Sequence, residues 1–135
     1  MNPDASDLWQ RATRAVRTAR EFSASDPDAA ASRAYYAAFY AVSALFALDG
    51  RSFSRHTAVE AAVHRDLVRN GRWPQERGED YSVLLQTRDT GDYGAGVHVT
   101  NEQTADAIER AERILAAVRA SSSEFHSPAD EQFTP

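Results

Sequence analysis

The segment from Asp26 to Gly50 does most to limit what this chain can fold into, because its apolar residues cover most of a helix. Asp26 is a good N-cap, Pro27 suits a first helical position, and Gly50 suits a helix end. At about 100° per residue the segment presents two neighbouring rows, namely Tyr35, Phe39, Val42 and Phe46, and then Arg33, Tyr36, Tyr40 and Ser43. A surface this wide predicts a central helix with partners on two sides.

Other segments also carry apolar residues at helical spacing, and they predict helices over residues 5–23, 55–70, 79–90 and 101–120. Ser54 is expected to cap one of them, and Thr100 with Gln103 fits a capping box before the last. The glycine-containing segment 91–99 is expected to break the chain into a loop. Because no stretch alternates strictly between apolar and polar residues, the sequence predicts an all-α domain over residues 1–121. A polar, flexible tail is expected over residues 122–135.

The charge balance bears on whether the chain binds nucleic acid. The chain has 135 residues with 15 basic and 20 acidic side chains, for a net charge of −5, and every basic residue is arginine. A strong, sequence-independent nucleic-acid binder needs a basic face that neutralises phosphates. This balance argues against such a binder and leaves room for a local arginine site.

Metal binding and membrane insertion have little support in the sequence. Cysteine is absent, and no two of the four histidines have metal-ligand spacing with a carboxylate on the same helix face. No run approaches the ~18 apolar residues that span a bilayer. The first residues lack the basic-then-apolar pattern of a signal peptide. We therefore expect no metal, no cofactor, no membrane contact and a cytoplasmic protein.

One arginine continues a row that is otherwise committed to packing. Tyr81, Leu84 and Leu85 set this row, and its next positions hold Arg88 and Asp92. A buried guanidinium is costly unless it is paired or placed in a cleft. One interpretation is a surface pair of Arg88 with Asp92, worth only ~0.3–0.5 kcal/mol. The other is a cleft in which the planar fork of Arg88 binds a phosphate with parallel hydrogen bonds.

The stretch from Asp28 to Tyr40 resembles the second helix of HEPN-domain proteins. It is most similar to a small stand-alone group with an S-R-A-Y-Y-A-x-F core, which stands here at residues 32–39. The similarity covers roughly residues 5–120 and continues through Gly50, Ser54-Arg55-His56, Val68-Arg69-Asn70-Gly71, Arg88 and Asp92-Tyr93-Gly94.

This resemblance implies an antiparallel up-and-down bundle of four to five helices that forms a homodimer, with the arginine region of each subunit lining a shared cleft. Many members are metal-independent RNases that act as toxins and are encoded beside a minimal nucleotidyltransferase antitoxin. Their motif is an arginine followed a few residues later by a histidine. Arg88 matches the arginine, whereas Asp92 and Tyr93 stand in place of the histidine, and the next histidine along the chain is His98.

RNA cleavage without a metal needs a base for the 2′-OH, an acid for the leaving 5′-oxygen and a cation for the charge on phosphorus. The sequence offers Arg88 as the cation, Asp92 as the base and Tyr93 as a proton donor. His56 is a second base candidate if its helix begins near the cleft. By analogy with related toxins, in which a tyrosine beside the motif receives AMP from the nucleotidyltransferase, Tyr93 is the expected AMP acceptor.

Arg33 is a second arginine on a packing face, beside Tyr36 and Tyr40, and Arg33 and Tyr36 therefore join the candidate site. Two classes of function stay open. The first is an RNase toxin neutralised by a nucleotidyltransferase. The second, prompted by the absent motif histidine and the acidic charge, is a non-catalytic HEPN module that binds a nucleotide or a nucleotidyltransferase partner.

Overall fold

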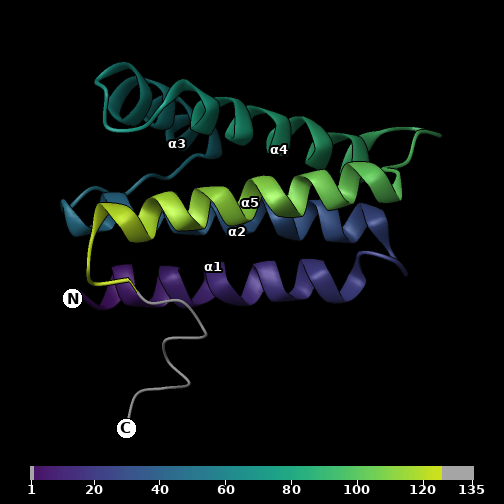
Figure 1. Ribbon diagram of the computed structural model, residues 1–135, viewed down its shortest axis with the longest axis horizontal. Coiled ribbons are helices and arrows are strands. Elements are labelled where there is room, and N and C mark those ends of the chain that lie inside the picture. The colour runs from purple at the N-terminus through teal and green to yellow at the C-terminus, as the bar shows by residue number, and fades with distance from the viewer. Residues whose placement is uncertain (1, 126–135) are drawn as a thin grey trace, which may run out of the picture.

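The computed structural model describes residues 2–125, and every regular element in that range is a helix (Figure 1). The elements are α1 (Pro3–Phe22), α2 (Pro27–Leu48), α3 (His56–Ala62), the π-helix η1 (Val63–Arg69), α4 (Gln75–Tyr93) and α5 (Asn101–Ser121). The long helices α1, α2, α4 and α5 lie alongside one another, with α1 antiparallel to α2 and α4 antiparallel to α5 (Figure 1). The all-α prediction is confirmed for these residues.

Helix α2 is the centre of the bundle, as predicted. Its second predicted row is only partly buried and holds Arg33, Tyr36, Tyr40 and Ser43. It packs against α1, α3, α4 and α5. Ala34, Ala38 and Ala41 are completely buried, and small side chains such as these let neighbouring helices approach closely. The aromatic residues of α2 are divided between core and surface, because Tyr35 is buried while Tyr36 remains partly exposed.

The predicted helix caps are found at α2 and α5. The carboxylate of Asp26 accepts the Ala29 N–H at 3.2 Å. Thr100 Oγ1 accepts the Gln103 N–H at 3.0 Å, and the Gln103 side chain accepts the Thr100 N–H at 2.9 Å. Beyond α2, Gly50 has a φ of 75°, a left-handed conformation that favours glycine.

The third predicted helix is not a single α-helix. It begins at His56, its N-cap is Arg55 rather than Ser54, and no side chain caps it. After Ala62 the chain continues as η1. A π-helix has a wider turn, with hydrogen bonds from i to i+5. The predicted apolar row survives this change, since its members Val59, Ala62, Val63 and Leu67 are all fully buried.

Helix α4 is longer than predicted and does not break at Gly91. It runs from Gln75 to Tyr93, so Gly91 lies within it. A Cβ at Gly91 would lie 2.9 Å from the carbonyl oxygen of Asp28. The missing side chain therefore lets α4 pass close to the start of α2, which is a packing role rather than a turn.

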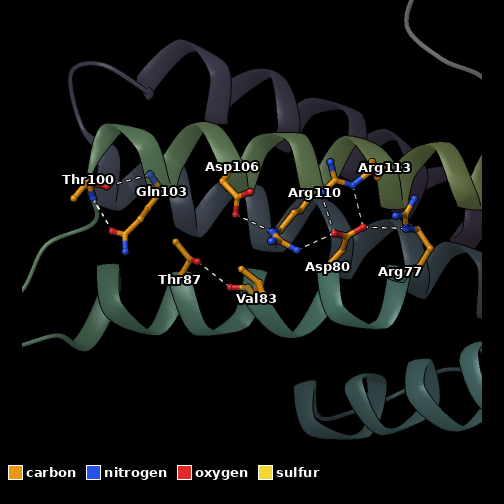
Figure 2. A network of polar contacts seen from close by, with 9 residues as sticks. All are labelled: Arg77, Asp80, Val83, Thr87, Thr100, Gln103, Asp106, Arg110 and Arg113. Atoms are coloured by element: carbon orange, nitrogen blue, oxygen red, sulfur yellow. Dashed lines mark hydrogen bonds and ion pairs between the residues drawn. The ribbon is translucent and has the colours of Figure 1, made fainter. Parts of the chain in front are cut away.

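A buried carboxylate joins α4 to α5. The side chain of Asp80 is 3% exposed and pairs with Arg77 on its own helix and with Arg110 and Arg113 on α5, at 2.9 to 3.2 Å (Figure 2). Arg110 also pairs with Asp106 at 2.7 Å. Burying one charge is tolerated here because several partners surround it. This network holds α4 against α5 at Asp80, about two helical turns before Arg88.

The chain stays in contact with the bundle just beyond α5. Phe125 is 4% exposed, and its ring centroid lies 4.9 Å from that of Trp9 on α1. The remainder of the expected tail, residues 126–135, lies outside the described residues. Among residues 2–125, no helix combines the length and the apolar character needed to cross a membrane.

Candidate functional site

Arg88 lies inside a ring of aromatic and acidic side chains, and its side chain is only 16% exposed. Its Nε lies 3.0 Å from Oδ2 of Asp92, and its Nη1 lies 3.3 Å from Oδ1 of Asp89. Its Nη2 donates to the hydroxyl of Tyr36 at 3.3 Å, which joins α4 to α2. The guanidinium carbon also lies 5.4 to 5.6 Å from the ring centroids of Tyr35, Tyr36 and Tyr93. The pairing and the aromatic surroundings make burial of this charge tolerable.

Tyr36 is the common neighbour of the other candidates. The guanidinium carbon of Arg33 lies 4.9 Å from its ring centroid, and Arg88 bonds to its hydroxyl. The ring of His56 meets it edge-on at 5.6 Å. Because the hydroxyl oxygen accepts a hydrogen bond from Arg88, its own O–H remains available to donate. The structure therefore brings two arginines and a histidine to one tyrosine.

His56 begins α3, and the aromatic residues of α2 hold its ring. The ring stacks on Phe39 with centroids 4.4 Å apart and planes 11° apart. Its Nδ1 lies 3.3 Å from the hydroxyl of buried Tyr35. The helix of His56 therefore begins against Tyr36, the same tyrosine that accepts a hydrogen bond from Arg88.

Asp92 and Tyr93 occupy the end of α4, one turn beyond Arg88. Asp92 faces Arg88 as the i,i+4 spacing predicts, and its side chain is 29% exposed. Tyr93 is 72% exposed and keeps its ring near the guanidinium. All six candidates from the sequence are thus linked to one cluster, which we call the Arg88 cluster: Arg33, Tyr36, His56, Arg88, Asp92 and Tyr93.

His98, the first histidine downstream of Arg88, is held elsewhere. Its Nδ1 lies 2.8 Å from Oδ2 of Asp28, at the start of α2, and its side chain is 76% exposed. The other oxygen of Asp28 accepts the Val99 N–H at 2.8 Å. The pKa of Asp28 is lowered by the Val99 N–H first and by His98 second. This contact anchors the loop that follows α4.

The electrostatics of the Arg88 cluster favour a charged arginine and neutral phenols. Burial lowers the pKa of Arg88, but Tyr36, Tyr93 and Asp92 raise it by more, so the net change is upward. Burial raises the pKa of Tyr35, and hydrogen bonding with the Tyr81 hydroxyl and the charge of Arg88 offset part of this rise. The cluster therefore presents a permanent cation beside groups that donate hydrogen bonds.

Sequence reasoning missed the roles of Tyr35 and Asp80. Tyr35 falls on an apolar row and was assigned to packing, although a buried phenol needs a hydrogen-bond partner. Asp80 directly precedes Tyr81 and lies one turn before Leu84, close to the buried row of α4. Three spacings in the sequence are further signals of the charge network: Arg77 to Asp80, Asp106 to Arg110, and Arg110 to Arg113.

Metal binding has no support in the part of the chain that is described. Within residues 2–125, no group of three or more histidine, cysteine, aspartate or glutamate side chains is arranged to hold an ion.

Comparison with known proteins identifies the family. The model of the HEPN domain matches residues 5–121. A UPF0332 protein of Thermotoga maritima is 44% identical to this chain over 89 residues, which are 66% of this chain and 67% of the relative. The HEPN model covers the bundle and the whole Arg88 cluster. This match agrees with the resemblance at the tyrosine-rich second helix. The chain belongs to the HEPN-domain family.

Proposed function

We propose that this protein is a toxin-like, metal-independent RNase that acts through the Arg88 cluster. The observation that carries the proposal is the position of Arg88, which bonds to Tyr36 beside the exposed imidazole of His56. A fixed cation next to groups able to move protons is what cleavage by the RNA 2′-OH requires.

The two arginines on Tyr36 suit a phosphate. A guanidinium has five N–H donors, and Nη1 and Nη2 of Arg88 each donate one hydrogen bond, so that one N–H on each of them has no partner among the described residues. Nε lies 3.0 Å from Oδ2 of Asp92 as an ion pair without hydrogen-bond geometry. Two of its N–H groups are left for a ligand. Asp89, at 53% exposure, is a partner that an incoming phosphate displaces readily. Arg33 lies over the same ring and adds a second charge.

The reaction assigned here is an internal transesterification. The 2′-oxygen loses its proton to a base and attacks phosphorus, and the bond from phosphorus to the 5′-oxygen breaks. Arg88 offsets the added negative charge, and Tyr93 protonates the leaving oxygen and regains its proton from water. The products carry a 2′,3′-cyclic phosphate and a 5′-hydroxyl.

The family suggests the setting of this activity. A homodimer would place two Arg88 clusters at a shared cleft, and a minimal nucleotidyltransferase would serve as the antitoxin, with Tyr93 as its AMP acceptor. The exposure of Tyr93, at 72%, supports that role because its hydroxyl is accessible to another enzyme. Sedimentation of the purified chain tests the dimer, since a monomer at micromolar concentration argues against a shared cleft.

The decisive experiment compares the wild type with Arg88→Ala on single-stranded RNA in excess chelator. We expect cleavage by the wild type and a loss of at least about 100-fold in the variant. Arg14→Ala is the matched control, because Arg14 is an exposed arginine on α1 outside the cluster. Intact RNA at high protein excess, together with normal growth of a bacterial host that expresses the chain, would refute the proposal.

A second candidate function is a non-catalytic module that binds a nucleotide or a nucleotidyltransferase. The pairing of Arg88 with Asp92 and Asp89 favours it, because these carboxylates occupy the cation and no motif histidine follows. Calorimetry with AMP tests this candidate. Binding that weakens in Arg88→Ala, with RNA left intact by the wild type, would favour the module over the RNase.

A further inference from the structure

The imidazole of His56 packs against two aromatic rings, although His56 is an exposed residue. Phe39 lies against one face of the ring, with planes 11° apart. Tyr36 meets the ring at 90°. These contacts constrain the plane of the ring.

The two ring nitrogens of His56 have different surroundings. Nδ1 lies 3.3 Å from the hydroxyl of Tyr35, whose side chain is 1% exposed. For Nε2, no hydrogen bond is found among residues 2–125. Nδ1 therefore faces a buried phenol, while Nε2 has no hydrogen-bond partner among the described residues.

We propose that His56 is the general base of the Arg88 cluster, and that Tyr35 is the positioning residue that fixes its tautomer. The proposal rests on the RNA cleavage proposed above and names the residue that replaces the missing motif histidine. Asp92, the base expected from the sequence, has Oδ2 within 3.0 Å of Arg88. In this proposal Asp92 orients the guanidinium of Arg88 and offsets its positive charge.

The tautomer follows from where the Tyr35 proton goes. Tyr35 meets Tyr81 edge to face, with centroids 5.9 Å apart. Tyr81 is fully buried, and its hydroxyl has no hydrogen-bond partner of good geometry among the described residues. Buried polar groups are almost always partnered, and we take the Tyr35 O–H to be the donor to the Tyr81 oxygen. The Tyr35 oxygen then accepts Nδ1–H of His56, which leaves the lone pair of Nε2 free to take a proton. The reverse direction, from Tyr81 to Tyr35, would place the proton of neutral His56 on Nε2, which is the outcome that overturns the role of Tyr35.

The charged and titratable groups near His56 come from three elements. Tyr35 and Tyr36 lie on α2, Arg88 on α4, and Glu60 one turn along α3 itself. Arg88 and Glu60 both act electrostatically on Tyr35, with opposite signs.

The step is balanced with groups of this chain. Nε2 of His56 takes the proton of the 2′-OH, the new bond forms between the 2′-oxygen and phosphorus, and the leaving 5′-oxygen takes a proton from Tyr93. The resulting imidazolium keeps Nδ1–H on Tyr35 and returns the other proton to water. Water restores Tyr93, so no further reactant is needed.

Nitrogen NMR of the wild-type protein tests the positioning step without any RNA. We expect neutral His56 to carry its proton on Nδ1, and Tyr35→Phe to move the ring toward the Nε2–H tautomer found in free histidine. A wild-type ring protonated on Nε2 would overturn the role of Tyr35, whether or not the protein cleaves RNA.

Cleavage kinetics test the base. His56→Gln is expected to reduce the single-turnover rate by about 100-fold or more, with RNA affinity unchanged and the acid limb of the pH profile lost. His64→Gln is the control, because His64 lies on η1 and bonds to Ser82, outside the cluster. Cleavage by His56→Gln at the wild-type rate would overturn the role of His56 and leave the proposed RNase intact. An inactive wild type would instead refute the RNase.

Discussion

Arg113 donates two hydrogen bonds to the carboxylate of Asp80, from Nε to Oδ2 at 3.2 Å and from Nη2 to Oδ1 at 3.0 Å. This fork joins α5 to α4 across 33 residues of sequence. Two parallel bonds fix orientation as well as distance. Since Asp80 is eight residues before Arg88 on the same helix, the fork also helps to set the direction from which Arg88 approaches α2.

Asp80→Asn should destabilise the protein by about 1–3 kcal/mol, because three partly exposed arginines lose the buried carboxylate that pairs with them and accepts hydrogen bonds from two of them. Urea unfolding measures the change. Asp106→Asn is the control, since its i,i+4 pair with Arg110 is 47% exposed at the aspartate and should cost less than about 0.5 kcal/mol. Equal losses in the two variants would contradict the importance given to burial.

Gly91→Ala should destabilise the fold by about 1–3 kcal/mol, because the new methyl group would press on the backbone of Asp28. The sign of the change in the free energy of unfolding tests the close approach of the two helices. In an open helix, the same exchange stabilises by up to about 1 kcal/mol. A rise in melting temperature would show that α4 does not approach α2 as closely as described.

The loop after α4 should loosen in acid. The pKa of Asp28 is lowered in the folded state, mainly by the Val99 N–H and then by His98. The stabilisation is therefore complete above the ordinary value of 3.8 and is lost as the pH falls through the lowered pKa. The protection factor of the Val99 amide, which compares its exchange with the intrinsic rate at the same pH, should fall over that range. In Asp28→Asn the protection factor should be low at every pH, and a pH-dependent protection factor kept in this variant would exclude Asp28 as its cause.

Tyr93→Phe should lower the rate of RNA cleavage by about 100-fold if its hydroxyl protonates the leaving oxygen. The phenylalanine ring keeps the packing over Arg88, so affinity for RNA should change little. Tyr40→Phe is the control, because the Tyr40 ring contacts Tyr36 and lies 6.0 Å from the guanidinium of Arg11. Cleavage by Tyr93→Phe at the wild-type rate would remove Tyr93 from the reaction.

Much of the fold could be read from the sequence, because caps and apolar rows act locally. Asp26 with Pro27 marks the start of α2, and Thr100 with Gln103 marks the start of α5, where the structure has them. The predictions at Ser54 and Gly91 were wrong because they too used local side-chain chemistry alone. Their side-chain chemistry suits a helix boundary, but Arg55 takes the cap and the approach of α2 keeps Gly91 inside α4.

The Arg88 cluster was predictable residue by residue and not as an arrangement. Arg88 and Asp92 are neighbours by helical spacing alone, so their ion pair follows from the sequence. The link from Arg88 to Tyr36 spans 52 residues and depends on how α4 crosses α2. No local pattern contains that information.

By itself, then, the sequence determined the helices, the central place of α2 and the odd placement of Arg88, because each follows from periodicity within one segment. Only the tertiary structure decided that His56 stacks on Phe39 and bonds to Tyr35, and that Asp80 gathers arginines from α5. These contacts join segments far apart in the chain. Their geometry is set by how whole helices pack, which no single helix encodes.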